Sequence, residues 1–357
     1  MSRMEPSGTE LQLVGTLRAA RSHWTPTLCV LYPGFPLAQQ VADDGIELVE
    51  LDGTSRSHLD RMRKLRRLAR SGEFDVVHTS LWGASAFGRA SVLGPARPAV
   101  VMSERRVEEF RGRRRRLLDQ GLARATDQWI GNSRDVCAFV SRAHHAPADR
   151  VHLIRNGVDT SVFHPARPAE RRPGPMRVGA LGRLVRQKGF DLLLDALPQV
   201  LQDVEVEVTI AGDGELRHEL VDRAAGLPVT IAGSITGSQA VADYLRDLDL
   251  FVMPSRYEGL PNAVIEALAC GVPVVAADVA GMREATGAAA TLVPPEDPAA
   301  LAAAIVSALA DPPRGAAPAS RSFDQVAADH LRVFDLAVQR RARATAPTRA
   351  GSSPGGR

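Results

Sequence analysis

The stretch PSRYEGLPNAVIEALACGVPVV, residues 254–275, organises the interpretation of the whole chain. It follows an apolar run at residues 250–253, which predicts a strand leading into a loop. Pro261 suits the first turn of a helix, where its missing N–H costs nothing. Gly271 fits the left-handed position after a helix, and the apolar residues 274–276 begin the next strand. The stretch therefore predicts a strand, a loop, a helix and a second strand in succession.

Two carboxylates lie beside the N-terminus of this expected helix, Glu258 on the loop and Glu266 inside the helix. The N-terminus of a helix binds anions through its free N–H groups and its dipole. Carboxylates would repel a phosphate there, so they are better suited to neutral hydroxyls further along the same ligand. A nucleotide-sugar has this layout, with a diphosphate for the N–H groups and sugar and ribose hydroxyls for the carboxylates. The alternative is a surface helix with two solvated glutamates.

The residues around the two glutamates form the patterns PSxxEGxP and EAxAxGxPVV. In this setting they resemble the Glu-x7-Glu motif of retaining glycosyltransferases of the GT-B fold, family 4. The resemblance spans about residues 7–310 and implies an α/β fold of two Rossmann-like, doubly wound domains facing across a cleft. It also implies transfer of a sugar from a UDP- or GDP-sugar to an acceptor hydroxyl, with retention of configuration. The products would be cell-surface polysaccharides, glycolipids or glycoconjugates.

A second motif, GRLVRQKGFD at residues 182–191, follows the first strand expected in the C-terminal half. Arg183 and Lys188 would lie in a strand-to-helix loop at the carboxyl edge of a sheet. Two cations there would neutralise a diphosphate and stabilise it as a leaving group; the alternative is an ordinary solvated loop. The motif matches the GRLxxxKGxD pattern of the same family, and the resemblance implies that both cations contact the donor diphosphate.

The resemblance also implies a set of donor-site residues. Arg183, Lys188 and Glu258 are the catalytic candidates, and Glu266 would hold the ribose hydroxyls. The other donor-binding candidates are loop positions, namely Gly182, Gly212, Gly233, Gly259, Leu260, Pro261 and Asn262. The nucleotide-sugar is the co-substrate, and we expect neither a cofactor nor an essential metal. The Asp-x-Asp sequence at residues 247–249 resembles a metal motif, but it lies where a helix ends and a strand begins, which is a structural position.

The N-terminal half offers weaker candidates for acceptor contact. The segment around Gly8 and Thr9 resembles the glycine loop of the family. His78 closes an expected strand at the cleft edge, where a structural histidine is an equally good interpretation. The family often has a histidine after its fifth strand, whereas this chain has the sequence MSERR. Either Glu104 or Arg105 substitutes for that histidine, or the acceptor contacts differ.

The first strand of the family is missing from this chain. A full strand precedes the glycine loop in the family, but here only residues 1–6 do, and they are too few and too polar. In a doubly wound sheet that strand is central. Its absence would leave unpaired backbone groups on two inner neighbours, at roughly 1–3 kcal/mol for each buried group. We therefore expect either a true start upstream of Met1 or a loosened N-terminal domain.

Short apolar runs alternate with helical patterns in both halves, which predicts βαβ units and parallel sheets. Residues 1–165 are expected to form a Rossmann-like acceptor-binding domain, and residues 176–322 a nucleotide-sugar-binding domain. A linker rich in Pro, Arg and Glu joins them at residues 166–175. A helix at residues 323–344 and a disordered tail at residues 345–357 end the chain. The expected strands are residues 27–31, 46–49, 74–77, 99–102, 128–130 and 151–154, then 176–181, 206–211, 229–232, 250–253, 274–276 and 290–293.

The chain has 357 residues, of which 45% are hydrophobic and 24% charged, as in globular proteins of two domains. Its charge is uneven, because residues 1–165 carry 24 basic against 18 acidic side chains. This basic half, with basic helices near residues 61–70 and 111–118, indicates an anionic partner such as a membrane surface or a lipid-phosphate acceptor. The alternative is a solvated surface. Without a signal peptide or a spanning apolar run, we expect a cytoplasmic protein, peripheral at the inner face of the plasma membrane if the lipid contact exists.

Two other functions stay open at this point. The missing strand and the replaced histidine would fit a sugar-nucleotide-binding subunit with impaired catalysis. A GT-B sugar-nucleotide epimerase, which needs no acceptor, would use the same donor site. A nicotinamide dehydrogenase is not supported, because no GxGxxG sequence follows an expected strand. Nucleic acid is not an expected partner.

Overall fold

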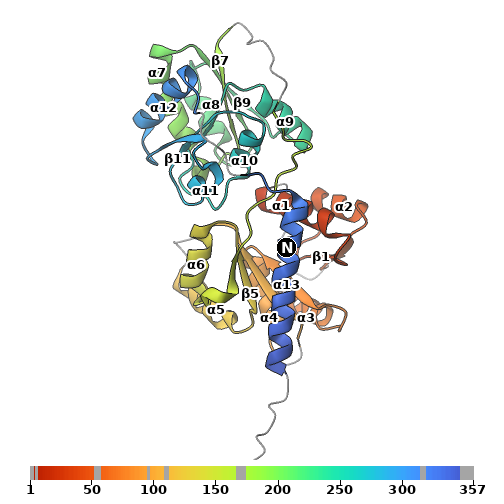
Figure 1. Ribbon diagram of the computed structural model, residues 1–357. Coiled ribbons are helices and arrows are strands. Elements are labelled where there is room, and N and C mark those ends of the chain that lie inside the picture. Colours follow the sequence, from red (N-terminus) through yellow and green to blue (C-terminus); the bar gives the residue numbers. More distant parts are fainter. Residues whose placement is uncertain are drawn as a thin grey trace, which may run out of the picture.

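The computed structural model has two α/β lobes, shown one above the other in Figure 1. Each lobe contains parallel strands flanked by helices. The N-terminal lobe is the lower one in this view, and a long C-terminal helix lies along it. The structure describes residue 4 and residues 7–51, 58–94, 97–107, 112–165, 174–313 and 319–345.

The C-terminal lobe is built on one six-stranded parallel sheet with the strand order β12-β11-β10-β7-β8-β9. The first strand, β7, is central, and the chain winds outward from it in both directions, which is the doubly wound arrangement expected from the sequence. All six strands were predicted within one residue of their observed ends. The strands are β7 (Met176–Leu181), β8 (Val206–Ala211), β9 (Val229–Ala232), β10 (Leu250–Met253), β11 (Val274–Ala277) and β12 (Ala290–Val293).

Both faces of this sheet are covered by helices. Alternate side chains of a strand point to opposite faces: Leu250 and Val252 of β10 belong to one core, and Phe251 and Met253 to the other. The first core includes α7 (Phe190–Asp203), α8 (Arg217–Arg223) and α12 (Pro298–Ala310). The second includes α9 (Ser238–Arg246), α10 (Asn262–Ala269) and α11 (Met282–Thr286). Burial on both faces explains why these strands read as continuous apolar runs.

The expected helix after residue 258 is α10, with one difference at its start. Pro261 is the N-cap residue, with an extended backbone, so the helix begins at Asn262 and not at the proline. Gly271 has φ +77°, the left-handed conformation expected after the helix. The boundary error is one residue, because Pro261 can equally precede the first helical residue as occupy it.

The N-terminal lobe has two separate parallel sheets. One holds β1 (Thr27–Val30) and β2 (Glu47–Glu50), and the other has the order β3-β4-β5-β6. Within the described residues no strand joins β1 to β3. The remaining strands are β3 (Val76–Ser80), β4 (Ala99–Glu104), β5 (Gln128–Gly131) and β6 (Val151–Leu153). The helices are α1 (Gly8–Ala20), α2 (Pro36–Asp43), α3 (His58–Ala69), α4 (Trp82–Ser91), α5 (Arg113–Ala123) and α6 (Arg134–His144).

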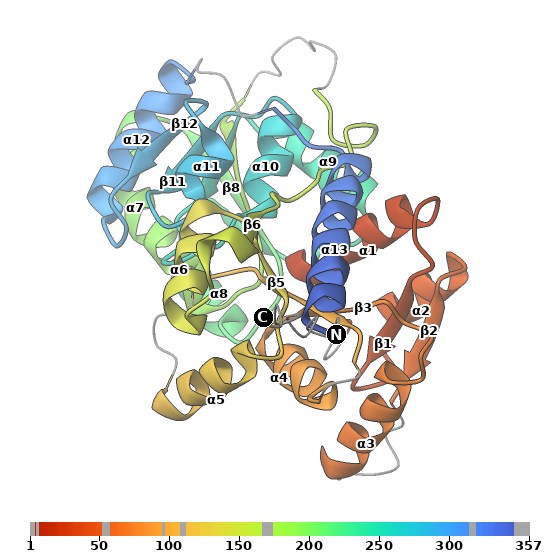
Figure 2. The same ribbon diagram turned by 60° about the horizontal axis from the view of Figure 1, so that its bottom comes forward.

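The last helix, α13 (Phe323–Thr345), follows the C-terminal lobe in sequence but packs on the N-terminal lobe (Figure 2). It contacts α1 and strands β3, β4 and β5. Its buried side chains Val326 and Val333 share a core with Val101 and Ile130 of the sheet. The sequence predicted a separate terminal helix, and the structure shows that this helix forms part of the core of the first lobe.

Two expected segments fall largely outside the described residues. Of the linker at residues 166–175 only the last two residues are described, and of the tail at residues 345–357 only the first. In the part of the chain that is described, no helix combines the length and apolarity needed to cross a bilayer.

The split N-terminal sheet generates a prediction about local stability. A two-stranded sheet is marginal on its own, and elements with few stabilising partners open most easily. We expect the backbone amides of β1 and β2 to exchange with solvent faster than those of β7 and β8. Hydrogen exchange followed by mass spectrometry measures this. Equal protection of the two pairs would show that the split does not weaken the lobe.

Candidate functional site

Lys188 and Glu258 are 70 residues apart in sequence and meet at the carboxyl edge of the C-terminal sheet. The Lys188 Nζ atom lies 2.6 Å from Glu258 Oε1, and Ser255 Oγ donates to the same oxygen at 2.9 Å. Lys188 ends the short 3-10 turn η2 (Arg186–Lys188) after β7, and Glu258 lies on the loop after β10, the strand paired with β7. The structure therefore brings together two of the three predicted catalytic residues.

Glycines allow the loops of this edge to stack closely. A Cβ atom on Gly182 would lie 3.2 Å from Lys188 Cε, and one on Gly212, where φ is +152°, would overlap the Gly182 carbonyl oxygen. A side chain at Gly212 would displace the Gly182 backbone, and one at Gly182 would crowd the Lys188 side chain. Gly233 is different, because an added Cβ there would meet no atom within 4 Å. Close packing therefore requires glycine at Gly212, whereas no protein atom restricts Gly233, and a role of either in donor binding stays a prediction.

Arg183 and Glu266 belong to the same two strand-to-helix segments as this pair, but neither forms a hydrogen bond or an ion pair with it. Arg183 follows β7 and is exposed, and Glu266 is half-buried on α10. Neither side chain forms a hydrogen bond or an ion pair with a residue that the structure describes. Burial raises the pKa of Glu266 from its ordinary value of 4.5 to about 7. A half-buried carboxyl group with a shifted pKa and no protein partner is typical of a ligand-binding position.

A chain of hydrogen bonds links the donor-side loop to the N-terminal lobe. Asn262 Nδ2 donates to the Gly8 carbonyl oxygen at 2.9 Å. Asn156 Nδ2 donates to Asn262 Oδ1 at 2.6 Å and to the Leu260 carbonyl oxygen at 3.0 Å. Arg105 Nη1 donates to Asn156 Oδ1 at 3.0 Å. Gly8 and Arg105, predicted to face the acceptor, therefore lie against the predicted donor loop. Asn156 was not among the site residues expected from the sequence, and only its position between the lobes reveals this bridging contact.

The two lobes also meet through backbone alone. A Cβ on Gly259 would overlap the Arg105 carbonyl oxygen, and a Cβ on Gly281 would overlap the Gly259 carbonyl oxygen. Asn132 Nδ2 donates to the Arg105 carbonyl oxygen at 3.2 Å. Burial lowers the pKa of the Arg105 guanidinium to about 10, an effect that the nearby Glu10 carboxylate opposes. The loops after β4, β10 and β11 are thus in direct contact at this point.

The remaining acceptor candidates lie deeper in the N-terminal lobe. Thr9 follows Gly8 on α1, and Glu104 is buried at the end of β4. His78 forms a 2.7 Å hydrogen bond with Ser103 Oγ, and its ring centroid is 5.6 Å from that of His330 on α13. Burial and the nearby charges hold the pKa of His78 well below its usual range. These contacts favour the structural interpretation of His78, since all of them lie within the lobe and its covering helix.

Several arginines of the expected basic surface are used inside the N-terminal lobe. The guanidinium carbon of Arg61 lies 4.7 Å from the centroid of the Tyr32 ring, and that of Arg115 lies 4.5 Å from the centroid of the Trp82 ring. Arg66 donates to the carbonyl oxygen of the last residue of α4 at 3.0 Å. Arg66 and Arg115 remain exposed despite these contacts, whereas Arg61 is buried.

Two family models match the chain along nearly its whole folded length. The model "Glycosyl transferases group 1" matches residues 175–311, and the model "Glycosyltransferase Family 4" matches residues 7–162. The chain belongs to the family 4 glycosyltransferases. It is therefore an enzyme of the glycosyltransferase class. It has the GT-B fold, which was predicted from the resemblance of residues 182–191 and 254–275 to motifs of this family.

Named relatives and solved structures agree with this assignment. The chain is 28% identical to the D-inositol 3-phosphate glycosyltransferase of Thermobispora bispora, over 88% of this chain and 81% of that one. It is 33% identical to a GDP-mannose-dependent phosphatidylinositol dimannoside mannosyltransferase of Mycobacterium tuberculosis, over 44% of this chain and 43% of that one. The structure of Anabaena HepE with UDP and glucose superposes with a TM-score of 0.75 at 20% identity, covering 96% of this chain and 97% of that one. At this identity the likeness to HepE establishes the fold alone.

The raised pKa of Glu266 predicts a dependence of stability on pH. Between about pH 4.5 and pH 7 the folded protein keeps a proton on Glu266 that the unfolded chain releases. The folded state then binds more protons, so this group lowers the free energy of unfolding as the pH rises through that window. We expect Glu266→Gln to remove this loss, so that the variant gains stability relative to wild type from pH 5 to pH 8.

Urea unfolding at a series of pH values measures the effect. Glu207→Gln, at an exposed position on β8, is the matched control and should run parallel to wild type. A Glu266→Gln curve that also runs parallel to wild type would contradict the shifted pKa.

Proposed function

We propose that this protein transfers a sugar from a nucleotide-diphosphate-sugar to an acceptor hydroxyl, with retention of anomeric configuration. The contact between Lys188 and Glu258 at the carboxyl ends of β7 and β10 carries the proposal. It places a cation at the edge where a doubly wound sheet binds its ligand. The printed names of relatives support such a donor: one is GDP-mannose-dependent, and HepE was also solved with UDP-glucose. UDP- and GDP-sugars are thus the donor classes to test.

Each side chain has a distinct role in this proposal. The Lys188 ammonium has three N–H donors and gives one to Glu258, which leaves two for phosphate oxygens. Arg183 adds a second cation, and together they would stabilise the charge that develops on the departing diphosphate. Glu258 orients Lys188 and, with the Gly259–Asn262 backbone, receives the sugar. Glu266 accepts from the ribose hydroxyls. Because the two cations neutralise the diphosphate, the proposal requires no metal and no other cofactor.

The proposed transfer reaction releases the nucleoside diphosphate as its leaving group. The bond between the anomeric carbon and the diphosphate oxygen breaks, and a bond from the acceptor oxygen forms on the same face of the sugar. The acceptor proton passes to the departing phosphate oxygen. Glu258 is the one carboxylate predicted beside the sugar, and it is held by Lys188 and Ser255. This arrangement suits a role in binding better than a role as nucleophile.

The acceptor would approach from the N-terminal lobe, at residues 1–165, while residues 176–322 hold the donor. Gly8, Thr9 and Arg105 lie nearest to the donor loop on that side. A lipid-linked sugar, a polysaccharide and a small molecule are the acceptor classes to screen. An acceptor at an anionic membrane would place the protein at the inner face of the plasma membrane. Vesicle flotation with and without anionic lipid tests that placement.

One observation favours a second candidate function. The N-terminal lobe is split into two sheets, and this is the lobe that would bind the acceptor. A chain weakened there would bind a nucleotide-sugar without transferring the sugar. Donor-dependent thermal stabilisation without product from any acceptor would support that candidate, and formation of an epimer from the donor alone would reveal an epimerase.

The loop after β7 provides a matched pair of arginine variants. Arg183 and Arg186 are both exposed cations on this loop, and only Arg183 belongs to the proposed diphosphate site. We expect Arg183→Ala and Lys188→Ala to lower kcat/KM by about 100-fold, the typical effect of removing a group that stabilises transition-state charge. Arg186→Ala should stay within about three-fold of wild type, because surface charges screened by solvent contribute little.

Donor turnover is measured as release of the nucleoside diphosphate, after a thermal-shift screen of UDP- and GDP-sugars has identified the donor. Wild-type turnover in Lys188→Ala, or equal losses in Arg183→Ala and Arg186→Ala, would refute the assigned site.

A further inference from the structure

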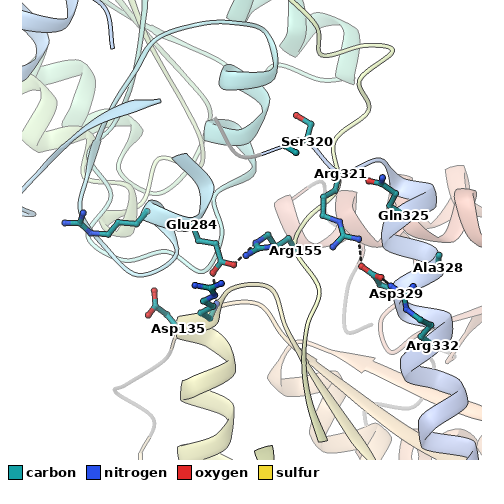
Figure 3. Close-up of a pocket in the computed structure, with 12 residues that line it drawn as sticks. Asp135, Arg155, Glu284, Ser320, Arg321, Gln325, Ala328, Asp329 and Arg332 are labelled. Atoms are coloured by element: carbon teal, nitrogen blue, oxygen red, sulfur yellow. Dashed lines mark hydrogen bonds and ion pairs between the residues drawn. The ribbon is translucent and has the colours of Figure 1, made fainter. Parts of the chain in front are cut away.

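A cavity of about 890 Å³ lies between the lobes, away from the proposed donor residues (Figure 3). Neither Arg183, Lys188, Glu258 nor Glu266 lines it. Its walls come from the starts of α6 and α11, the segment after β6, residues 319–321 just before α13, and the first turns of α13. The side chains that dominate its lining are arginines, namely Arg134, Arg155, Arg283, Arg321 and Arg332.

The lining has more positive than negative charge, since three carboxylates face the five arginines. Glu284 Oε1 pairs with Arg155 Nε at 2.6 Å. The Asp329 carboxylate forms ion pairs with two guanidinium groups, those of Arg321 and Arg332. The third carboxylate, that of Asp135, accepts a hydrogen bond from a backbone N–H group. Arg283 also pairs with Asp278, just outside the lining. With this pair counted, the cavity keeps a small excess of positive charge, which Arg155 and Arg321 share.

Arg155 and Arg321 retain unused hydrogen-bond donors in the middle of this lining. A guanidinium group carries five N–H donors, but Arg155 uses only Nε and Arg321 only Nη2 in contacts with residues that the structure describes. Both side chains are partly buried, with 36% and 29% of their surface exposed. Figure 3 shows them between Glu284 on one side and Asp329 on the other. Each guanidinium is held on its outer side, which leaves the other side for a ligand.

The two arginines lie where the lobes are joined to each other. Glu284 of α11 binds Arg155 and also accepts from the backbone N–H of Arg134 at the start of α6, at 2.7 Å. In return, Asp135 of α6 accepts from the Gly281 N–H at the start of α11, at 2.9 Å. A ligand on Arg155 and Arg321 would therefore contact the N-terminal lobe and the segment that crosses back to it from the C-terminal lobe.

We propose that this cavity binds a compact, free anion that carries phosphate and at least two negative charges. Guanidinium groups recognise phosphate oxygens through pairs of parallel N–H donors, a geometry that lysine cannot supply. The anion would lie between Arg155 and Arg321 and complete their hydrogen bonds. Because the anion would join the segment after β6 to the segment that leads into α13, next to the Glu284 and Asp135 contacts between the lobes, its binding stabilises this arrangement of the chain. This site is separate from the donor site and does not depend on the proposed transfer reaction.

Inorganic pyrophosphate is the probe, and its affinity is measured by isothermal titration calorimetry on the full chain. We expect Arg155→Gln and Arg321→Gln each to weaken binding by about ten-fold, the effect of losing one charge-assisted hydrogen-bonding group. Arg223→Gln is the control, because Arg223 is equally ion-paired, with Asp195, but lies on α8 away from the cavity. Its affinity should equal that of wild type.

A further variant separates this cavity from the donor site. Lys188→Ala should keep its affinity for pyrophosphate in the cavity, whereas loss of all binding in Lys188→Ala would mean that pyrophosphate binds only at the donor site and would overturn the proposal. Absence of binding by wild type at millimolar concentration, or equal affinities in Arg321→Gln and Arg223→Gln, would also overturn it. Arg321→Gln is the decisive variant, because it leaves the Arg155–Glu284 ion pair between the lobes intact. Thermal melting verifies that each variant is folded.

Discussion

The proposed donor site depends on the contact between the Lys188 ammonium and the Glu258 carboxylate. Both side chains are largely shielded from water, with 16% and 8% of their surfaces exposed, so neither charge could remain there alone without a substantial desolvation cost. The pair holds two neighbouring loops in one position at the edge of the sheet. It also keeps a cation ready at the place where a diphosphate would arrive, so little reorganisation is needed when the ligand binds.

The loop that carries Glu258 packs against neighbouring loops through glycine backbone atoms, without intervening side chains. Gly259 lies against the Arg105 carbonyl group of the other lobe, and Gly281 lies against the Gly259 carbonyl group. A side chain at Gly259 would push the Arg105 loop of the other lobe away, and one at Gly281 would separate the loops after β10 and β11. Asn156 adds a polar connection at the same place, because it bonds to the donor loop and to Arg105. The loop that carries Glu258 is therefore also part of the contact between the two lobes.

Much of the C-terminal lobe was predictable because its strands are specified by residues that are close together in sequence. Strands buried on both faces are continuous apolar runs, and glycines and prolines mark where they end, so all six were found. Lys188 and Glu258 could be placed on the same edge because parallel strands end together. Their direct contact could not be predicted, since a motif gives residue types and spacing but not side-chain geometry.

The N-terminal lobe shows where this reasoning fails. The packing of α13 against β4 depends on a return of the chain from the other lobe, and no local pattern signals it. The same applies to Gln12, which exchanges two hydrogen bonds with the Gly157 backbone, 145 residues away in sequence. The separation of the described N-terminal strands into two sheets also depends on pairing between distant segments.

A crystal structure of the chain with UDP or GDP bound tests the central claim most directly. The account predicts the diphosphate within about 2.7–3.2 Å of Lys188 Nζ and the Arg183 guanidinium, the range of ordinary hydrogen bonds, with the ribose hydroxyls on Glu266. A nucleotide bound elsewhere, or one whose diphosphate lies on the far side of the sheet from Lys188, would contradict it.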